Sequence, residues 1–167
     1  PFAGGTGSEG FPYLICSAKQ LYNMHDSAAY LNASFALLAD IDLNSYTKGL
    51  ANVADRPAEA AACWSVGQTW QPLGSTYAGC TRTINAFTGS IYGGNHRITG
   101  MRMRLEDENG VGFIGQWDPT SYKTITDLTF VKAQVAGLAG VGGVVGDRPS
   151  TATPPIADIS YIKMISP

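Results

Sequence analysis

The chain reads Ile98-Thr99-Gly100-Met101-Arg102-Met103 at one point, and this phrase returns as Ile125-Thr126-Asp127-Leu128-Thr129-Phe130. A third copy reads Ile156-Ala157-Asp158-Ile159-Ser160-Tyr161. A second phrase, Gly112-Phe113-Ile114-Gly115, reappears as Gly143-Val144-Val145-Gly146. The first two copies are 27 residues apart (98 to 125), and the later copies of both phrases are 31 apart (125 to 156, 112 to 143). Because periods of about 20 to 50 residues are typical of stacked architectures, the sequence predicts successive turns of a β-solenoid.

The three copies also predict which side chains face the interior. With turns stacked about 4.8 Å apart, equivalent apolar positions would form continuous ladders. The step between the first two apolar positions of each copy, with Gly100, Asp127 or Asp158 just before the second, indicates a corner between two strands. The predicted ladders are Ile98, Ile125 and Ile156; Met101, Leu128 and Ile159; and Met103, Phe130 and Tyr161.

Composition limits the partners of this protein. The 167 residues suffice for one domain with a core, and we treat residues 1–167 as a single domain. Only 14% of the residues are charged and the net charge is −2, which disfavours nucleic acid and anionic membrane as partners. Because no apolar run approaches the roughly 20 residues of a membrane span, we expect no membrane insertion. A chain that begins on Pro1 is expected to come from a larger protein.

A short helix is predicted near the N-terminus, over residues 17–32. Ser17 and Gln20 form a capping box, in which each side chain satisfies a free amide of the first helical turn. Leu21, Met24, Ala28 and Leu31 follow at helical spacing on one face. We expect this helix to cover the open end of the first turn.

Residues 44–80 carry no repeat phrase and are predicted to form a long excursion, with regular turns over 87–166. The excursion holds two tryptophans, which argue against disorder. Cys63 and Cys80, both in this segment, are the favoured disulfide pair, which leaves Cys16 as a buried thiol in the first strand. The cysteines and the two histidines fit no metal-site spacing.

Several phrases resemble the GLUG-type repeats of bacterial surface proteins. The resemblance is carried by residues 87–98, 111–115, 125–128 and 141–146, and by a leader that includes Pro12-Tyr13-Leu14-Ile15 and Trp70-Gln71-Pro72-Leu73-Gly74. It covers most of the chain except about 46–67. It implies a right-handed parallel β-solenoid from a large secreted or cell-surface adhesin, with neighbouring modules as partners and no catalytic residues. Gly112-Phe113-Ile114-Gly115 stands where the family prefers Gly-Leu-Phe-Gly, a change that preserves apolar volume.

Aromatic residues outside the repeats are the candidate ligand-binding side chains. Flat rings in exposed loops suit sugar faces or protein partners, although packing of the excursion onto the stack is the favoured explanation for Trp64 and Trp70. The candidates are Trp64, Trp70, Tyr77, Tyr92 and Trp117.

Four other sequence patterns contain residue types that could bind a ligand or take part in catalysis. The glycines of 137–146 miss the dinucleotide-binding spacing. The acidic run Glu106-Asp107-Glu108-Asn109 has oxygen ligands of the kind that bind Ca²⁺, but it lacks the spacing of an EF-hand loop. We therefore expect a solvated turn and no cofactor. Asp40 with Asp42 could pair as acid and base, and His96 with Arg97 could serve a polysaccharide-cleaving β-helix. We expect structural hydrogen bonding for the first pair and a plain turn for the second.

The sequence therefore predicts a non-catalytic module of a secreted or cell-surface adhesin. It would act as a spacer, as a binder of carbohydrate or protein, or as both. The alternative is a carbohydrate-active enzyme, a lyase or hydrolase, on a β-helix.

Overall fold

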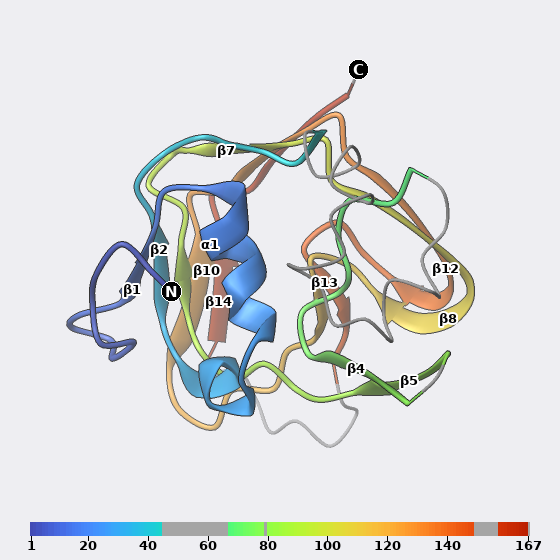
Figure 1. The fold of residues 1–167 in the computed structure, drawn as a ribbon, viewed down its shortest axis with the longest axis horizontal. Helices are drawn as coiled ribbons and strands as arrows, with labels where there is room; N and C mark the ends of the chain where they lie inside the picture. Colours follow the sequence, from blue (N-terminus) through green and yellow to red (C-terminus); the bar gives the residue numbers. More distant parts are fainter. Residues whose placement is uncertain (45–66, 79, 149–156, 167) are drawn as a thin grey trace.

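The computed structural model describes residues 1–44, 67–78, 80–148 and 157–166, and strands are the main regular structure of these residues (Figure 1). Short strands predominate because β-branched and aromatic residues alternate with turn-forming Gly, Asn and Asp. The elements are β1 (Tyr13–Ile15), α1 (Ala18–Tyr22), the 3₁₀ helices η1 (Asn23–His25) and η2 (Ala28–Asn32), β2 (Phe35–Leu37), β3 (Ile41–Asp42), β4 (Ser75–Ala78), β5 (Thr81–Ile84), β6 (Ile91–Tyr92), β7 (Arg97–Thr99), β8 (Arg102–Val111), β9 (Ile114–Gln116), β10 (Lys123–Thr126), β11 (Thr129–Val131), β12 (Gln134–Val141), β13 (Val145–Asp147), β14 (Ala157–Ser160) and β15 (Lys163–Ile165).

Parallel pairing between segments far apart in the sequence organises these strands. One parallel sheet has the order β1-β2-β6-β10-β14, and a second has the order β15-β11-β7-β3. Two further parallel pairs are β12 with β8 and β13 with β9, whereas β4 and β5 form an antiparallel hairpin. Figure 1 shows the strands of the first sheet side by side along one flank. The prediction of a mainly β fold built from parallel strands is confirmed.

The register places one apolar side chain above another through the interior. In the first sheet, Phe35 pairs with Ile91, Ile91 with Ile125, and Ile125 with Ile159. In the second sheet the equivalent ladder runs through Ile41, Ile98, Phe130 and Met164.

The predicted ladders are wrong, because they match residues of strands that do not pair with one another. Ile98 lies in register with Phe130, not with Ile125, and Ile159 lies in register with Ile125, not with Leu128. Tyr161, predicted to follow Phe130, is 82% exposed. The repeated phrase describes a strand that ends in a corner, and this unit occurs more than once in each turn of the chain.

Corners confirm part of the prediction. Asp127 and Gly100 both adopt positive φ, at 56° and 76°, as the sharp turns require. Asp158 was predicted to be a third corner, but it lies within β14, and the corner falls at Tyr161 with φ of 53°.

The second phrase does keep its predicted register, because Ile114 pairs with Val145. Its glycines let two turns approach closely. A Cβ on Gly146 would lie 2.4 Å from Gly110 C and from Val111 N, a distance at which the backbone must shift. Glycine at this position therefore sets the separation of β8 and β13.

The N-terminal helix is shorter than predicted. Ser17 caps α1 by accepting the Gln20 amide at 3.2 Å, and the Gln20 side chain accepts the Cys16 amide at 2.7 Å. The α-helix ends at Tyr22 and η1 at His25, and the extended backbone of Ser27 separates them from η2. Figure 1 shows α1 inside the outline traced by the strands, and its Leu21 is fully buried in the core.

Part of the predicted excursion belongs to the stack. The Thr69 amide donates to Arg102 O at 2.9 Å, and Leu73 forms a parallel bridge with Ile114. Trp70 and Leu73 are both fully buried. The segment that follows Gly67 thus fills one side of a turn, and residues 45–66 and 79 lie outside the described residues.

Candidate functional site

The two described tryptophans are core residues and not exposed binding platforms. Trp70 is 0% exposed, stacks on Phe113 with ring centroids 5.0 Å apart, and donates Nε1–H to Phe113 O at 2.9 Å. Trp117 is 2% exposed and donates Nε1–H to Gly89 O at 3.0 Å. Both indole N–H groups are used and both rings are buried, so the structure agrees with the packing explanation for Trp70 and does not show either ring as an exposed platform.

Of the other three aromatic candidates, the structure describes only the side chain of Tyr92. Tyr92 is half-buried on the outer face of β6 and donates its hydroxyl to Glu9 Oε2 at 2.7 Å. Burial and the hydrogen bond to Glu9 raise the pKa of Tyr92. Trp64 and the side chain of Tyr77 lie outside the described residues.

Glu9 is a polar centre that the sequence analysis missed. Its Oε1 accepts Ser34 Oγ–H at 2.6 Å, Ser90 Oγ–H at 3.1 Å and Lys123 Nζ–H at 2.7 Å. Burial opposes ionisation of Glu9, but the hydrogen bonds from Lys123, Ser34, Tyr92 and Ser90 outweigh it and lower its pKa to about 2. The only signal in the sequence was that Glu9 is the single charged side chain of a Gly-rich leader.

The Glu9 cluster is a clamp and not a reactive site. Its partners come from three neighbouring turns, just before or within β2, β6 and β10. Because both carboxylate oxygens of Glu9 already accept hydrogen bonds, the carboxylate is not free to act as a general base. It ties the N-terminal loop to the outer face of the sheet.

The cysteine predictions are confirmed in part. Cys80 is disulfide-bonded, whereas Cys16 carries a free thiol. Cys63, the predicted partner of Cys80, lies outside the described residues. Cys16 is exposed and not buried as predicted, because side chains alternate along β1 and Ile15 takes the inward position.

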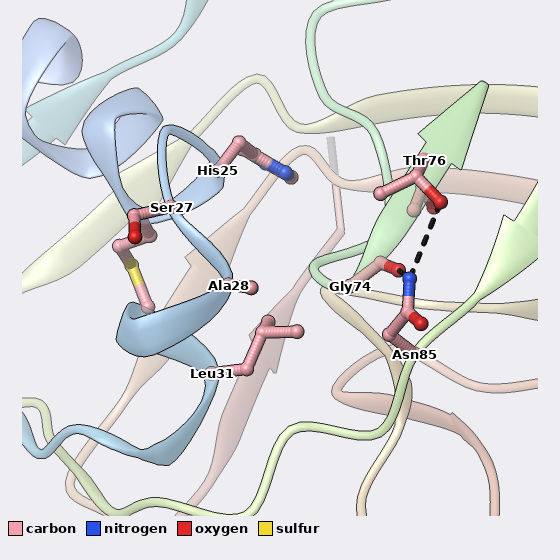
Figure 2. A pocket seen from close by; sticks show the side chains of 9 residues that line it. His25, Ser27, Ala28, Leu31, Gly74, Thr76 and Asn85 are labelled. Atoms are coloured by element: carbon pink, nitrogen blue, oxygen red, sulfur yellow. Dashed lines mark hydrogen bonds between the residues drawn. The ribbon is translucent and has the colours of Figure 1, made fainter. Parts of the chain in front are cut away.

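A cavity of about 370 Å³ lies between the 3₁₀ helices and the β4–β5 hairpin (Figure 2). Its volume is at the lower end of the range for small-molecule sites, which is about 300–1,000 Å³. One wall is mainly apolar and the opposite wall carries hydroxyl and amide groups. The lining residues are Met24, His25, Ser27, Ala28, Leu31, Gly74, Ser75, Thr76 and Asn85.

His25 is the distinctive group of this cavity. Figure 2 shows its ring nitrogens directed toward the β4 side. Its Nε2 is shielded from solvent and has no hydrogen-bond partner, and its ring packs against Trp70 with centroids 4.8 Å apart. Burial lowers the pKa of His25 to about 4, so the ring is neutral at pH 7. A buried imidazole nitrogen without a hydrogen-bond partner destabilises the folded state by roughly 1–3 kcal/mol. A polar ligand group that formed this hydrogen bond would restore that stability.

The hairpin wall is held rigidly. The Asn85 side-chain amide donates to Gly74 O and to Thr76 Oγ1, each at 3.2 Å (Figure 2). Arg82 donates to Ser75 Oγ at 2.7 Å and to Asn109 O and Gly110 O of β8 at 2.8 and 2.9 Å. The hairpin is thereby fixed to the stack, and the cavity has a defined width. No feature of the sequence had marked His25 beyond its position in a helical segment.

The remaining candidate pairs have structural partners. Asp40 accepts the Arg97 amide at 2.9 Å and lies 3.3 Å from His96 Nδ1, and these contacts, the Arg97 amide first, lower the pKa of Asp40. Asp42 accepts the Asn44 amide at 2.8 Å. The prediction of structural hydrogen bonding for Asp40 and Asp42 is confirmed.

The acidic run 106–109 was predicted to be a turn but lies in β8. Arg104 and Arg82 pair with two of its three carboxylates, through contacts to Glu106 at 2.9 Å and to Glu108 at 3.7 Å. Within the ranges that the structure describes, no three His, Cys, Asp or Glu side chains gather where a metal ion could be held. Among the same residues, no helix has the length and apolar character needed to cross a membrane.

The described residues thus define a mainly parallel β protein with one hydroxyl-lined cavity. The chain is similar to halomucin from Haloquadratum walsbyi, with 29% identity over 88% of this chain and 1% of halomucin. It is also similar to a proposed Gly-rich membrane protein from Evansella cellulosilytica, with 34% identity over 88% of this chain and 14% of that protein. The chain therefore spans only a small part of both relatives. No protein-family model matches the sequence.

The fold has a relative among solved structures. A proposed immunoglobulin A1 protease from Bacteroides ovatus superposes with a TM-score of 0.57 and 19% identity, over 99% of this chain and 40% of that chain. At this identity the likeness concerns the fold alone.

Proposed function

We propose that this chain is a non-catalytic β-solenoid module of a cell-surface adhesin, in which it acts as a spacer and holds a hydroxyl-bearing ligand beside His25. The observation that carries the proposal is the in-register ladder of apolar side chains through successive parallel strands, Phe35, Ile91, Ile125 and Ile159. Such a stack extends in one direction and keeps its cross-section, which is what a spacer requires. The similarity to halomucin and to a membrane protein supports a location at the cell surface.

Three further observations support a role without catalysis. The carboxylates of Glu9, Asp40 and Asp42 are each engaged by backbone or side-chain donors. None of these three carboxylates lines the cavity of His25, and burial lowers the pKa of that ring. Hydrolases need clustered carboxylates, and lyases need a base beside charge-neutralising groups, but no Asp, Glu, Lys or Arg is among the described residues that line the cavity. The resemblance to GLUG-type repeats leads to the same proposal.

A hydroxyl is the ligand group that best fits His25. A neutral imidazole carries one N–H and one lone pair, and a hydroxyl satisfies Nε2 in either tautomer because it both donates and accepts. The apolar wall formed by Met24 and Leu31 suits the carbon face of a sugar ring. The cavity volume of about 370 Å³ fits one or two such rings.

A glycan array on the full chain, followed by analysis of the bound glycans for cleavage products, tests the proposal. We expect binding without products, and we expect His25→Phe to abolish it while the melting temperature is retained. His96→Phe, which changes the other histidine of the chain at an exposed turn, serves as the matched control and should bind normally. Product formation would overturn the non-catalytic role in favour of a carbohydrate-active enzyme. If the His25→Phe variant still bound the glycan, the proposal that the ligand lies in this cavity would be refuted.

A further inference from the structure

The last described turn leaves its interior side chains uncovered. Ile159 is 45% exposed, whereas Ile125 and Ile91 below it are 0% and 2% exposed. Met164 is 51% exposed, whereas Phe130 below it is fully buried. Positions that form the core in every earlier turn are therefore half-exposed in this one.

This exposure extends over one continuous end of the stack. β14 and β15 are the outermost strands of the two large sheets, so their outer backbone edges have no strand partner among the described residues. β12 lies at the same end, and its Val141 is 46% exposed although its partner Val111 is fully buried. Leu138 and Ile165 are exposed there as well. Monomeric proteins rarely leave so many apolar groups together in water.

The opposite end is closed. Ile15 of β1 and Ile41 of β3, the end strands of the two large sheets, are 0% and 2% exposed, and Leu21 of α1 and Met24 of η1 belong to the same buried core cluster. The edge of β1 is also covered, since Gly4 bridges to Leu14 and the Ala3 amide donates to Leu14 O at 2.8 Å. The stack thus has one capped end and one open end.

Among the described residues, the inward positions of the open end carry no charge that would prevent edge pairing. Protected edges carry prolines or inward-pointing charges. The inward positions of β14 and β15 are Ile159 and Met164, and the charged Asp158 and Lys163 take alternate positions along the strands. The edge is therefore suited to accept another strand.

We propose that this open end is a docking surface for one further turn of parallel β-strands. The incoming turn would place an apolar residue over Ile159 and another five positions later over Met164, the spacing that Ile125 and Phe130 already show. It would join the sheets in parallel, as each described turn does. The inference rests on the proposed stacked architecture but not on the ligand cavity.

An extended chain tests the proposal directly. Residues 1–166 are followed by a second copy of residues 133–166, which supplies one turn of 34 residues, the step from Ile125 to Ile159 in the register. Ile159→Asp and Ile125→Asp are each introduced at the original positions in both chains. Urea unfolding midpoints, limited proteolysis and sedimentation are then measured.

We expect the extended chain to resist proteolysis and to unfold at a higher urea concentration than the original chain. Ile159→Asp should lower the midpoint of the extended chain nearly as much as Ile125→Asp does, and that of the original chain by less than half as much. An equal effect of Ile159→Asp in the two chains, or trimming of the added turn by protease, would overturn the docking proposal. An original chain that forms a dimer, and becomes monomeric on Ile159→Asp, would assign the surface to a second copy and would also overturn it. Tolerance of Ile125→Asp in both chains would instead refute the stacked architecture.

Discussion

Glu9 holds the N-terminal leader against three turns of the large sheet, and Glu9→Gln should release part of that hold. The amide keeps the shape of the side chain and one acceptor oxygen, but it loses the charge that pairs with Lys123 at 2.7 Å. The hydroxyls of Ser34 and Ser90, 1% and 0% exposed as residues, keep a neutral acceptor. The substitution therefore removes the negative charge and one of the two acceptor oxygens, which receive Tyr92 on one side and Ser34, Ser90 and Lys123 on the other.

The magnitude follows from the pKa of Glu9. A change from 4.5 to about 2 corresponds to roughly 3 kcal/mol of preference for the ionised form in the folded state. Because the Glu9 side chain is 42% exposed, solvent screening reduces the expected loss to about 1–2 kcal/mol at pH 7. The folded state releases the proton more readily than the unfolded state, so this stabilisation is complete above pH 4.5 and is lost as the pH falls from 4.5 toward 2.

Urea unfolding of both chains at pH 7, 4 and 3 measures this difference. The gap between wild type and Glu9→Gln should be largest at pH 7 and should narrow steadily toward pH 3. Glu106→Gln is the control, because its carboxylate is 61% exposed and pairs with an Arg104 side chain that is 70% exposed. It should change the free energy of unfolding by less than about 0.5 kcal/mol. Equal stability of Glu9→Gln and wild type at pH 7, or a gap that does not depend on pH, would refute the reasoning.

Three other substitutions or labels test separate parts of the structure. Leu128→Asp places an unpaired carboxylate at a fully buried position and should abolish the cooperative melting transition, and a near-native melting temperature would contradict the core assignment. Trp117→Ala should cost about 3–5 kcal/mol in urea unfolding and leave any glycan binding unchanged, whereas reduced binding by a stably folded variant would restore Trp117 as a contact residue. Iodoacetamide should modify Cys16 in the native, unreduced chain and leave Cys80 untouched, as mass spectrometry of tryptic peptides would report; modification of Cys80 would argue against its disulfide.

The sequence predicted the stacking of parallel strands but not its phase. Ile98 and Ile125 head similar phrases because each is an inward residue followed, two positions later, by a left-handed corner, at Gly100 and Asp127. Phe130 has the same relation to a corner at Lys132. One turn contains two such units, so matching them by letters pairs strands of different sheets.

The Gly-rich phrase behaved differently. Its register was predicted correctly, and the structure shows that Gly146 is required there by a close approach of two backbones. A glycine fixed by steric contact is a better marker of register than an apolar residue, which suits any inward position.

The sequence left both packing and binding open for the tryptophans, because composition does not reveal which turn a tryptophan fills. Trp70 follows a segment without repeats, yet its Nε1–H reaches Phe113 O across 43 positions of sequence. The groups that line the cavity were missed for the same reason. His25 and Asn85 belong to a helical segment and a hairpin that only the folded stack brings together.

Packing between neighbouring strands explains where the cavity and the exposed apolar end of this protein lie. Each turn buries its ladder against the turn beside it, so surfaces that differ from the repeat arise where an added element meets the stack or where a neighbour is absent. The first case gives the His25 cavity, between the 3₁₀ helices and a hairpin tied to β8 by Arg82. The second gives the apolar end at Ile159 and Met164. Sequence change in the added elements can alter the lining of the cavity without disturbing the ladder, because only the ladder positions are constrained by the strands on either side.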